Sequence, residues 1–125
     1  MFEDDDEDRI EAARNLSGGD RRWAAEAFRS IAVDAGVGED VRLEAARELA
    51  EIDQRSAAEA SRSIAVDAGV GEDVRLEAAM LAQGDRRWAA KAFRSIAVDE
   101  SVGEDVRLEA ARELAGLSER SAGVP

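Results

Sequence analysis

Residues 20–52 read DRRWAAEAFRSIAVDAGVGEDVRLEAARELAEI, and this unit occurs three times in a chain of 125 residues. Residues 85–117 differ from it at only five of 33 positions, and residues 53–84 repeat it with one residue fewer. The second half of the unit also precedes the first copy, since EDRIEAARNL aligns with DVRLEAAREL at an offset of 33. Repeats of this period are typical of stacked arrays. We therefore predict a single domain over 1–125, divided into a half-repeat at 6–19, repeats at 20–52, 53–84 and 85–117, and a tail at 118–125.

Each unit is predicted to form two helices. In the first, Trp23, Phe28 and Ile31 fall on one face at the helical period. Asp20 precedes this segment as a plausible N-cap, and Asp53 and Asp85 recur at the same position. The glycines of AGVG suit a tight turn into a second amphipathic helix. The pattern predicts seven helices and no strand, at about 6–16, 20–34, 38–51, 53–67, 71–83, 85–99 and 103–116.

A single helix pair cannot bury both of its flanks, so neighbouring units must stack on one another. The predicted fold class is all-α, an α-solenoid of stacked antiparallel helix pairs that follows a superhelical course. The stretches at 1–5 and 118–125 are expected to be solvated tails.

One arginine in each unit breaks the amphipathic pattern. Arg42 lies in the middle of the apolar face of its helix, and a buried cation needs an acidic partner. Arg75 and Arg107 repeat this position. The acids that recur before it are Asp34, Asp67 and Asp99, with Asp40, Asp73 and Asp105 as the alternative set.

The string DVRLEAARELAEI, followed by an aspartate, resembles the second helix of HEAT-like repeats, including those of the phycobilisome-lyase type. In that family a turn aspartate and a Val-Arg pair recur and form a ladder between successive repeats. The resemblance implies a HEAT-like superhelix with a structural ladder of Arg42, Arg75, Arg107, Asp34, Asp67 and Asp99. Tetratricopeptide repeats are the alternative, suggested by the period of 32–33 residues and a Trp in the first helix, although their Leu-Gly, Tyr and Pro positions are missing.

The composition excludes several classes of function. With 29 acidic and 17 basic residues the net charge is −12, which disfavours nucleic acids and anionic membranes and favours a basic protein or peptide. No stretch approaches the roughly 20 apolar residues of a membrane span, and a cytoplasmic location is expected. His, Cys and Tyr are absent, so the usual acid–base and nucleophile constellations cannot be assembled. We predict no enzyme, and no catalytic, cofactor-binding or metal-binding residue.

The predicted function is a non-catalytic protein–protein interaction scaffold, and the alternative is a structural, self-assembling or engineered repeat protein without a specific ligand. The candidate partner-binding residues are Arg47, Met80 and Arg112 on the second helices, and Trp23 and Trp88 on the first helices. The two tryptophans either pack between repeats or bind a ligand, and Ser56 replaces them in the middle unit. Near-identical units, with an apolar flank left on the last helix, also favour a homo-oligomer formed by end-to-end stacking.

Overall fold

The computed structural model describes the backbone of residues 2–17 and 20–122, and the side chains of residues 6–16 and 20–117. This part of the chain forms seven α-helices, one short 3₁₀ helix and no strand, which confirms the predicted all-α class and the number of helices. The elements are α1 (Phe2–Ser17), α2 (Arg21–Val33), α3 (Glu39–Ile52), α4 (Gln54–Ala65), α5 (Glu72–Leu81), η1 (Ala82–Gly84), α6 (Arg86–Ala97) and α7 (Glu104–Ala122).

The first helix of each unit begins at the predicted aspartate. The carboxylate of Asp20 accepts hydrogen bonds from the backbone N–H groups of Arg22 and Trp23, at 3.0 and 3.3 Å. Asp53 caps α4 in the same way, and Asp85 caps α6 by accepting from the backbone N–H of Arg87. A side-chain acceptor at this position satisfies donors that the helix itself leaves unpaired. The N-cap prediction is confirmed for all three units.

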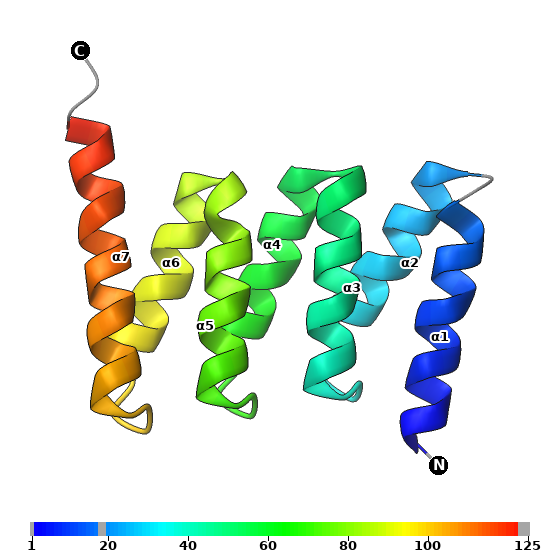
Figure 1. Cartoon of the computed structure of the whole chain (residues 1–125), viewed down its shortest axis with the longest axis horizontal. Coiled ribbons are helices and arrows are strands. Elements are labelled where there is room, and N and C mark those ends of the chain that lie inside the picture. The colour runs from blue at the N-terminus through cyan, green and yellow to red at the C-terminus, as the bar shows by residue number, and fades with distance from the viewer. Residues whose placement is uncertain (1, 18–19, 123–125) are drawn as a thin grey trace.

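The helices lie in two layers (Figure 1). The odd-numbered helices α1, α3, α5 and α7 stand side by side in one layer, and α2, α4 and α6 stand behind them in the other. Within the described residues each helix contacts only the next one or two along the chain. The helices α1 and α7 therefore lie at opposite ends of the molecule.

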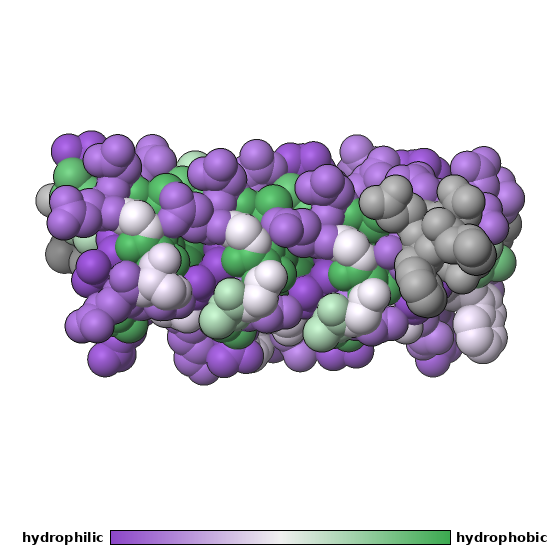
Figure 2. Space-filling view, turned by 90° about the horizontal axis from the view of Figure 1, so that it is seen from below, coloured by the Kyte–Doolittle hydropathy of each residue, from purple (hydrophilic) through white to green (hydrophobic). Residues whose placement is uncertain are grey.

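The core between the layers is built mainly from small side chains. Alanines of every helix from α1 to α7 are buried, and Phe28 and Phe93 are the largest fully buried side chains among the described residues. Small residues let the helix backbones approach closely, so that many short contacts take the place of a few large ones. The turns that join the layers repeat as well, since Val37, Val70 and Val102 are all buried. Figure 2 shows hydrophobic atoms at three regularly spaced places on this end of the molecule.

The one-residue deletion in the middle unit is absorbed by a change of helix type. Its second helix, α5, ends at Leu81 and continues as the 3₁₀ helix η1 up to Gly84. The 3₁₀ helix rises about 2.0 Å per residue, against about 1.5 Å in an α-helix. By these rises α5 and η1 together span about 21 Å, as the 14 residues of α3 do. The junction with the third unit therefore stays in register.

The internal helices agree with the predicted bounds to within two residues, but the two outer stretches do not. Residues 2–5 and 118–122, expected to be solvated tails, belong to α1 and α7. Acidic residues favour the first turn of α1 because they oppose the positive end of the helix dipole. In α7 no proline interrupts the helix before residue 125. The expected tail at residues 1 and 123–125 lies outside the described residues.

No helix in the described part of the chain is both long enough and apolar enough to cross a membrane. The cytoplasmic location stays a prediction.

Ser61 gives a test of the core. Its hydroxyl is fully buried and has no hydrogen-bond partner among the described residues, at the position that Phe28 and Phe93 occupy in the outer units. A buried unpaired polar group costs about 1–3 kcal/mol, so Ser61→Ala is expected to raise the free energy of unfolding by about 1 kcal/mol. Ser63→Ala is the matched control, because the Ser63 hydroxyl already bonds the Glu59 carbonyl. Urea denaturation of both variants measures the difference, and a loss of stability in Ser61→Ala would contradict the expectation.

Candidate functional site

The arginines that lie in the apolar face of the second helix link neighbouring helices at the junctions between units. Arg42 on α3 is 3 % exposed, its Nε donates to the Ala32 carbonyl at 2.9 Å, and its Nη1 donates to Asp67 at 2.9 Å. Ala32 lies at the end of α2, and Asp67 follows α4 in the next unit. A buried guanidinium must be hydrogen-bonded and paired with a negative charge, and these two acceptors meet that requirement for Arg42.

The same arrangement repeats along the array. Arg75 donates to the Ala65 carbonyl and to Asp99, both at 2.8 Å. At the N-terminal end Arg9 of α1, which aligns with Arg42 at the repeat offset, pairs with Asp34 at 3.0 Å. At the C-terminal end Arg107 donates to the Ala97 carbonyl at 3.2 Å, but no carboxylate among the described residues pairs with it.

The structure thus brings together five of the six ladder residues named from the sequence, and adds Arg9 as the first rung. Each turn aspartate accepts from the arginine of the preceding unit, so that Asp34 pairs with Arg9 and not with Arg42. The alternative acids Asp40, Asp73 and Asp105 are exposed in the first turns of α3, α5 and α7. Alignment of the half-repeat with the full unit was the signal from which Arg9 could have been found.

The ladder aspartates are held in the charged form. The Arg42 guanidinium, helped by the backbone N–H of Gly69, lowers the pKa of the Asp67 carboxyl. The Ser101 hydroxyl and the Arg75 guanidinium lower the pKa of Asp99 well below its ordinary value. For Asp34 the pairing with Arg9 lowers the pKa in the same way. Each carboxylate accepts several donors at once, which stabilises its ionised form.

A second ladder runs beside the first and was not foreseen from the sequence. The carboxylates of Asp6, Glu39 and Glu72 accept hydrogen bonds from the backbone N–H groups of Gly38, Gly71 and Gly103, at 2.9, 3.0 and 2.7 Å. A Cβ on Gly71 would lie 3.1 Å from the Glu39 Oε2. The described glycines all have negative φ, so close approach of this carboxylate, rather than a left-handed turn, explains why glycine stands there.

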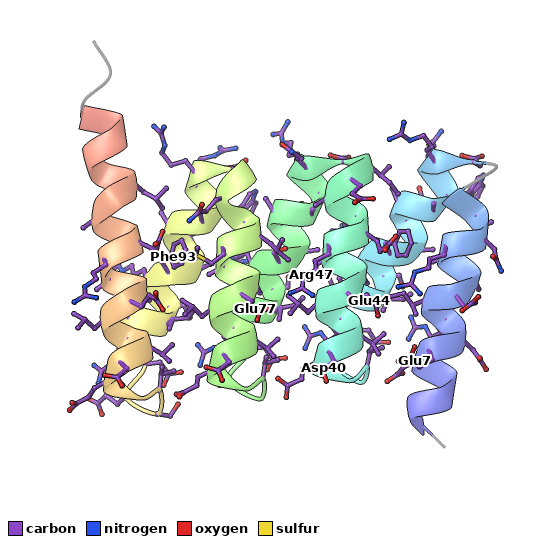
Figure 3. All side chains as sticks on the ribbon, in the orientation of Figure 1. Glu7, Asp40, Glu44, Arg47, Glu77 and Phe93 are labelled. Atoms are coloured by element: carbon purple, nitrogen blue, oxygen red, sulfur yellow. The ribbon has the colours of Figure 1, made fainter. Side chains whose placement is uncertain are left out.

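The odd-numbered helices carry a third row of paired polar side chains. Arg14 pairs with Glu44, and Arg47 pairs with Glu77 at 2.6 Å (Figure 3). Met80 replaces the arginine in α5, and Gln83 instead donates to Glu113 at 3.1 Å. Of the partner-binding residues predicted on this face, Arg47 is thus engaged in an ion pair. Met80 and Arg112 are exposed on α5 and α7.

The two predicted tryptophans lie in different surroundings. Trp88 is half-buried between α4 and α6, where the Arg62 Cζ lies 5.3 Å and the Lys91 Nζ 5.0 Å from the centre of its ring. The buried Arg62 Nε has no hydrogen-bond partner among the described residues, and the ring face attracts this cation instead. Trp23 is 61 % exposed, because among the described residues α2 is the first helix of the layer that α2, α4 and α6 form, and no helix of that layer lies before it.

The middle unit leaves a groove where the outer junction has a tryptophan. Ser56 of α4 aligns with Trp88, and a groove of about 670 Å³ lies beside it between α2 and α4. The groove is lined by Arg21, Arg22, Ala25, Glu26, Arg29, Ile52, Asp53, Gln54 and Ser56. Arg29 aligns with Arg62, so the groove already carries the cation that covers the ring in the next junction. The replacement at residue 56 was evident from the sequence, but the open space beside it required the structure.

No group of three or more Asp and Glu side chains among the described residues is placed to hold a metal ion. No protein-family model matches the chain, and no curated protein or solved structure is significantly similar to it.

Two aspartates of the ladder form a matched pair for mutation. Asp67→Asn leaves the buried Arg42 without a charged acceptor, and a hydrogen bond to a charged group contributes about 1.5–3 kcal/mol. Asp34→Asn should have a smaller effect, because the side chains of Arg9 and Asp34 are 40 % and 44 % exposed and solvent-accessible pairs contribute little. Urea unfolding of the two variants should show the larger loss for Asp67→Asn. Equal losses would mean that burial of the arginine does not govern the strength of the ladder.

The lowered pKa values also predict how acid affects stability. Because the folded-state pKa values of Asp67 and Asp99 lie below those of the unfolded chain, the folded state binds fewer protons in acid. Their stabilising contribution is complete above the unfolded pKa of about 3.9 and is lost as the pH falls further. The free energy of unfolding should therefore decrease from about pH 5 to about pH 2 less steeply in Asp67→Asn/Asp99→Asn than in the unmodified chain. Urea titrations at each pH measure both slopes.

Proposed function

We propose that this chain is a non-catalytic scaffold for protein–protein interaction, built as a short HEAT-like α-solenoid. Contacts that run only between near neighbours support the solenoid, because arrays of this class are close to one-dimensional. A ladder in which Arg42 and Arg75 each join their own unit to the next supports the likeness to HEAT repeats. His, Cys and Tyr, which many acid–base and nucleophile constellations use, are absent from the sequence.

The groove beside Ser56 is the observation that carries the proposal. At the α4–α6 junction the corresponding space is filled by the chain's own Trp88, which lies beneath Arg62 and Lys91. At the α2–α4 junction Ser56 leaves that space open, while Arg29 stays in place above it. The groove therefore keeps an arginine at the position that covers Trp88, but not the tryptophan itself. Ligand sites are typically concave and of several hundred cubic ångströms, as this one is.

The partner that fits is a protein segment with an aromatic side chain, tryptophan above all. The ring would insert between α2 and α4, with Arg29 over its face as Arg62 lies over Trp88. Arg29 is available for this role because its only described ion pair, to Glu59, is long at 3.4 Å and exposed. The net charge of −12 favours basic residues elsewhere in the partner, since a field of that sign attracts cations from a distance.

The chain supplies its own control variant. Ser56→Trp copies the residue of the outer units into the middle one and fills the groove, and the fold is expected to persist because the α4–α6 junction already holds a tryptophan. Peptides selected from a random library on the unmodified chain should contain an aromatic residue. Their affinity should fall about tenfold or more on Ser56→Trp, measured by fluorescence anisotropy.

Two further measurements complete the design. Replacing the aromatic residue of a selected peptide by alanine should weaken binding to the unmodified chain to the same extent. Circular dichroism and urea unfolding of Ser56→Trp verify that the fold is kept. Selected peptides that bind Ser56→Trp as tightly as the unmodified chain would refute the groove as the binding site.

A further inference from the structure

The two ends of the array are chemically complementary. At the C-terminal end α7 presents Arg107 without a described carboxylate partner, and Glu104 in the position from which Glu39 and Glu72 reach the glycine of the next unit. Leu108 is 53 % exposed there, whereas Leu43, at the same position in α3, is 5 % exposed. This surface is the one that inner units use to bind their successor, but no successor follows among the described residues.

The N-terminal end presents the matching acceptors. Asp34 and the backbone N–H of Gly38 are the groups that an arginine and an acid of a preceding unit would contact. Here α1 supplies both partners, Arg9 for Asp34 and Asp6 for Gly38. Thus α1 stands where the second helix of a preceding unit would stand. The sequence of α7 suits the same place.

Three features show that α1 fills this place less completely than α7 would. Asp8 of α1 stands where α3, α5 and α7 carry Val41, Val74 and Val106. A groove of about 270 Å³ remains between α1 and α2, since no helix of the α2, α4 and α6 layer lies before them among the described residues. Trp23 stays exposed for the same reason.

We propose that chains join head to tail, with α7 of one copy replacing α1 of the next against α2 and α3. In the joined array Arg107 pairs with Asp34, and Glu104 accepts from the Gly38 N–H, as at every inner junction. The helix α6 then lies beside α2 of the second copy, and it fills the groove that α1 leaves open. Trp23 packs on Arg94, as Trp88 packs on Arg62. A single interface thus pairs Arg107 and covers Leu108 of one copy and Trp23 of the other.

The exchange is favourable because α7 makes the same bonds to Asp34 and Gly38 that α1 makes, and its chain adds contacts that α1 alone cannot make. The ion pair to Asp34 and the hydrogen bond from Gly38 are lost from α1 and formed again with α7. Val106 takes the position of Asp8, and the packing of α6 against α2 is new. Since one α1 is released for each chain that joins, association competes with an intramolecular contact and depends on concentration. The helix α1 therefore acts as a cap that limits growth. The inference does not rest on the groove at Ser56, which lies inside the array.

The oligomeric state of the full chain is the first test. Sedimentation equilibrium from micromolar to millimolar concentration should show association that increases with concentration. Arg107→Glu places a carboxylate opposite Asp34 and should weaken association about tenfold or more. Asp34→Arg repels Arg9 of its own chain as much as Arg107 of the other copy, so its association should stay close to that of the unmodified chain. A chain that is strictly monomeric throughout this range would overturn the proposal.

Mixing the two variants tests directly whether residues 107 and 34 of different copies meet. The carboxylate introduced by Arg107→Glu can pair with the guanidinium that Asp34→Arg introduces on the other chain. The two ends left unmodified still match, so an equimolar mixture should associate more tightly than either variant alone. Failure of the mixture to do so would contradict the Arg107–Asp34 contact. Trp23→Ser, which copies the residue at position 56, should also weaken association without loss of fold.

Hydrogen exchange tests the release of α1. As the concentration of the unmodified chain rises, backbone amides of residues 6–16 should lose protection while those of residues 104–114 gain it. Association with unchanged protection of residues 6–16 would show that chains meet without the exchange, and would refute the role of α1 as a displaced cap. The peptide-binding assay with Ser56→Trp is unaffected by these outcomes, so the two proposals can fail separately.

Discussion

The hydrogen bonds of the buried arginines in α3 and α5 are the interaction on which the rest of the structure depends. A guanidinium out of water requires acceptors in fixed directions, and Arg42 finds one on the helix before it and one in the turn of the unit after it. Neither acceptor belongs to its own helix, so the bond pair fixes where three successive helices lie. In a core composed largely of alanine, which offers little shape to interlock, such directional bonds define the register between units.

Most of the secondary structure could be predicted because its signals are local. The aspartate caps and the helical periodicity are contained in a few consecutive residues, and they recur in each unit. The direction of the ladder could not be obtained in this way. Asp34 and Asp67 are equivalent by sequence, and only the stacking decides that Arg42 reaches the second of them. The Glu39–Gly71 contact was missed because the turn glycines are equally compatible with a left-handed turn, and all described glycines have negative φ.

Departures from the repeat have local physical consequences that the structure makes explicit. The missing residue near Met80 is recovered by the longer rise of η1, so the deletion does not shift the third unit. The loss of a tryptophan at residue 56 is not recovered in this way, because no neighbouring side chain fills the space and a groove remains. A change along the helix axis can be absorbed by the backbone, whereas a change of volume between helices cannot.

In an array of near-identical units, the end surfaces can bind further units, which is not so in a protein with a single non-repeating core. Every surface that binds a neighbour inside the array is reproduced at one end, so whatever lies there must either differ from the repeat or be covered. At the N-terminal end α1 carries the charged Asp8 where the repeat has a valine, yet it copies the repeat closely enough to engage Asp34 and Gly38. At the C-terminal end α7 copies the repeat without such a change, and its Leu108 stays exposed. The ends are therefore unequal, with a substitutable cap on one side and a complete binding surface on the other. That inequality gives any association between copies a head-to-tail direction.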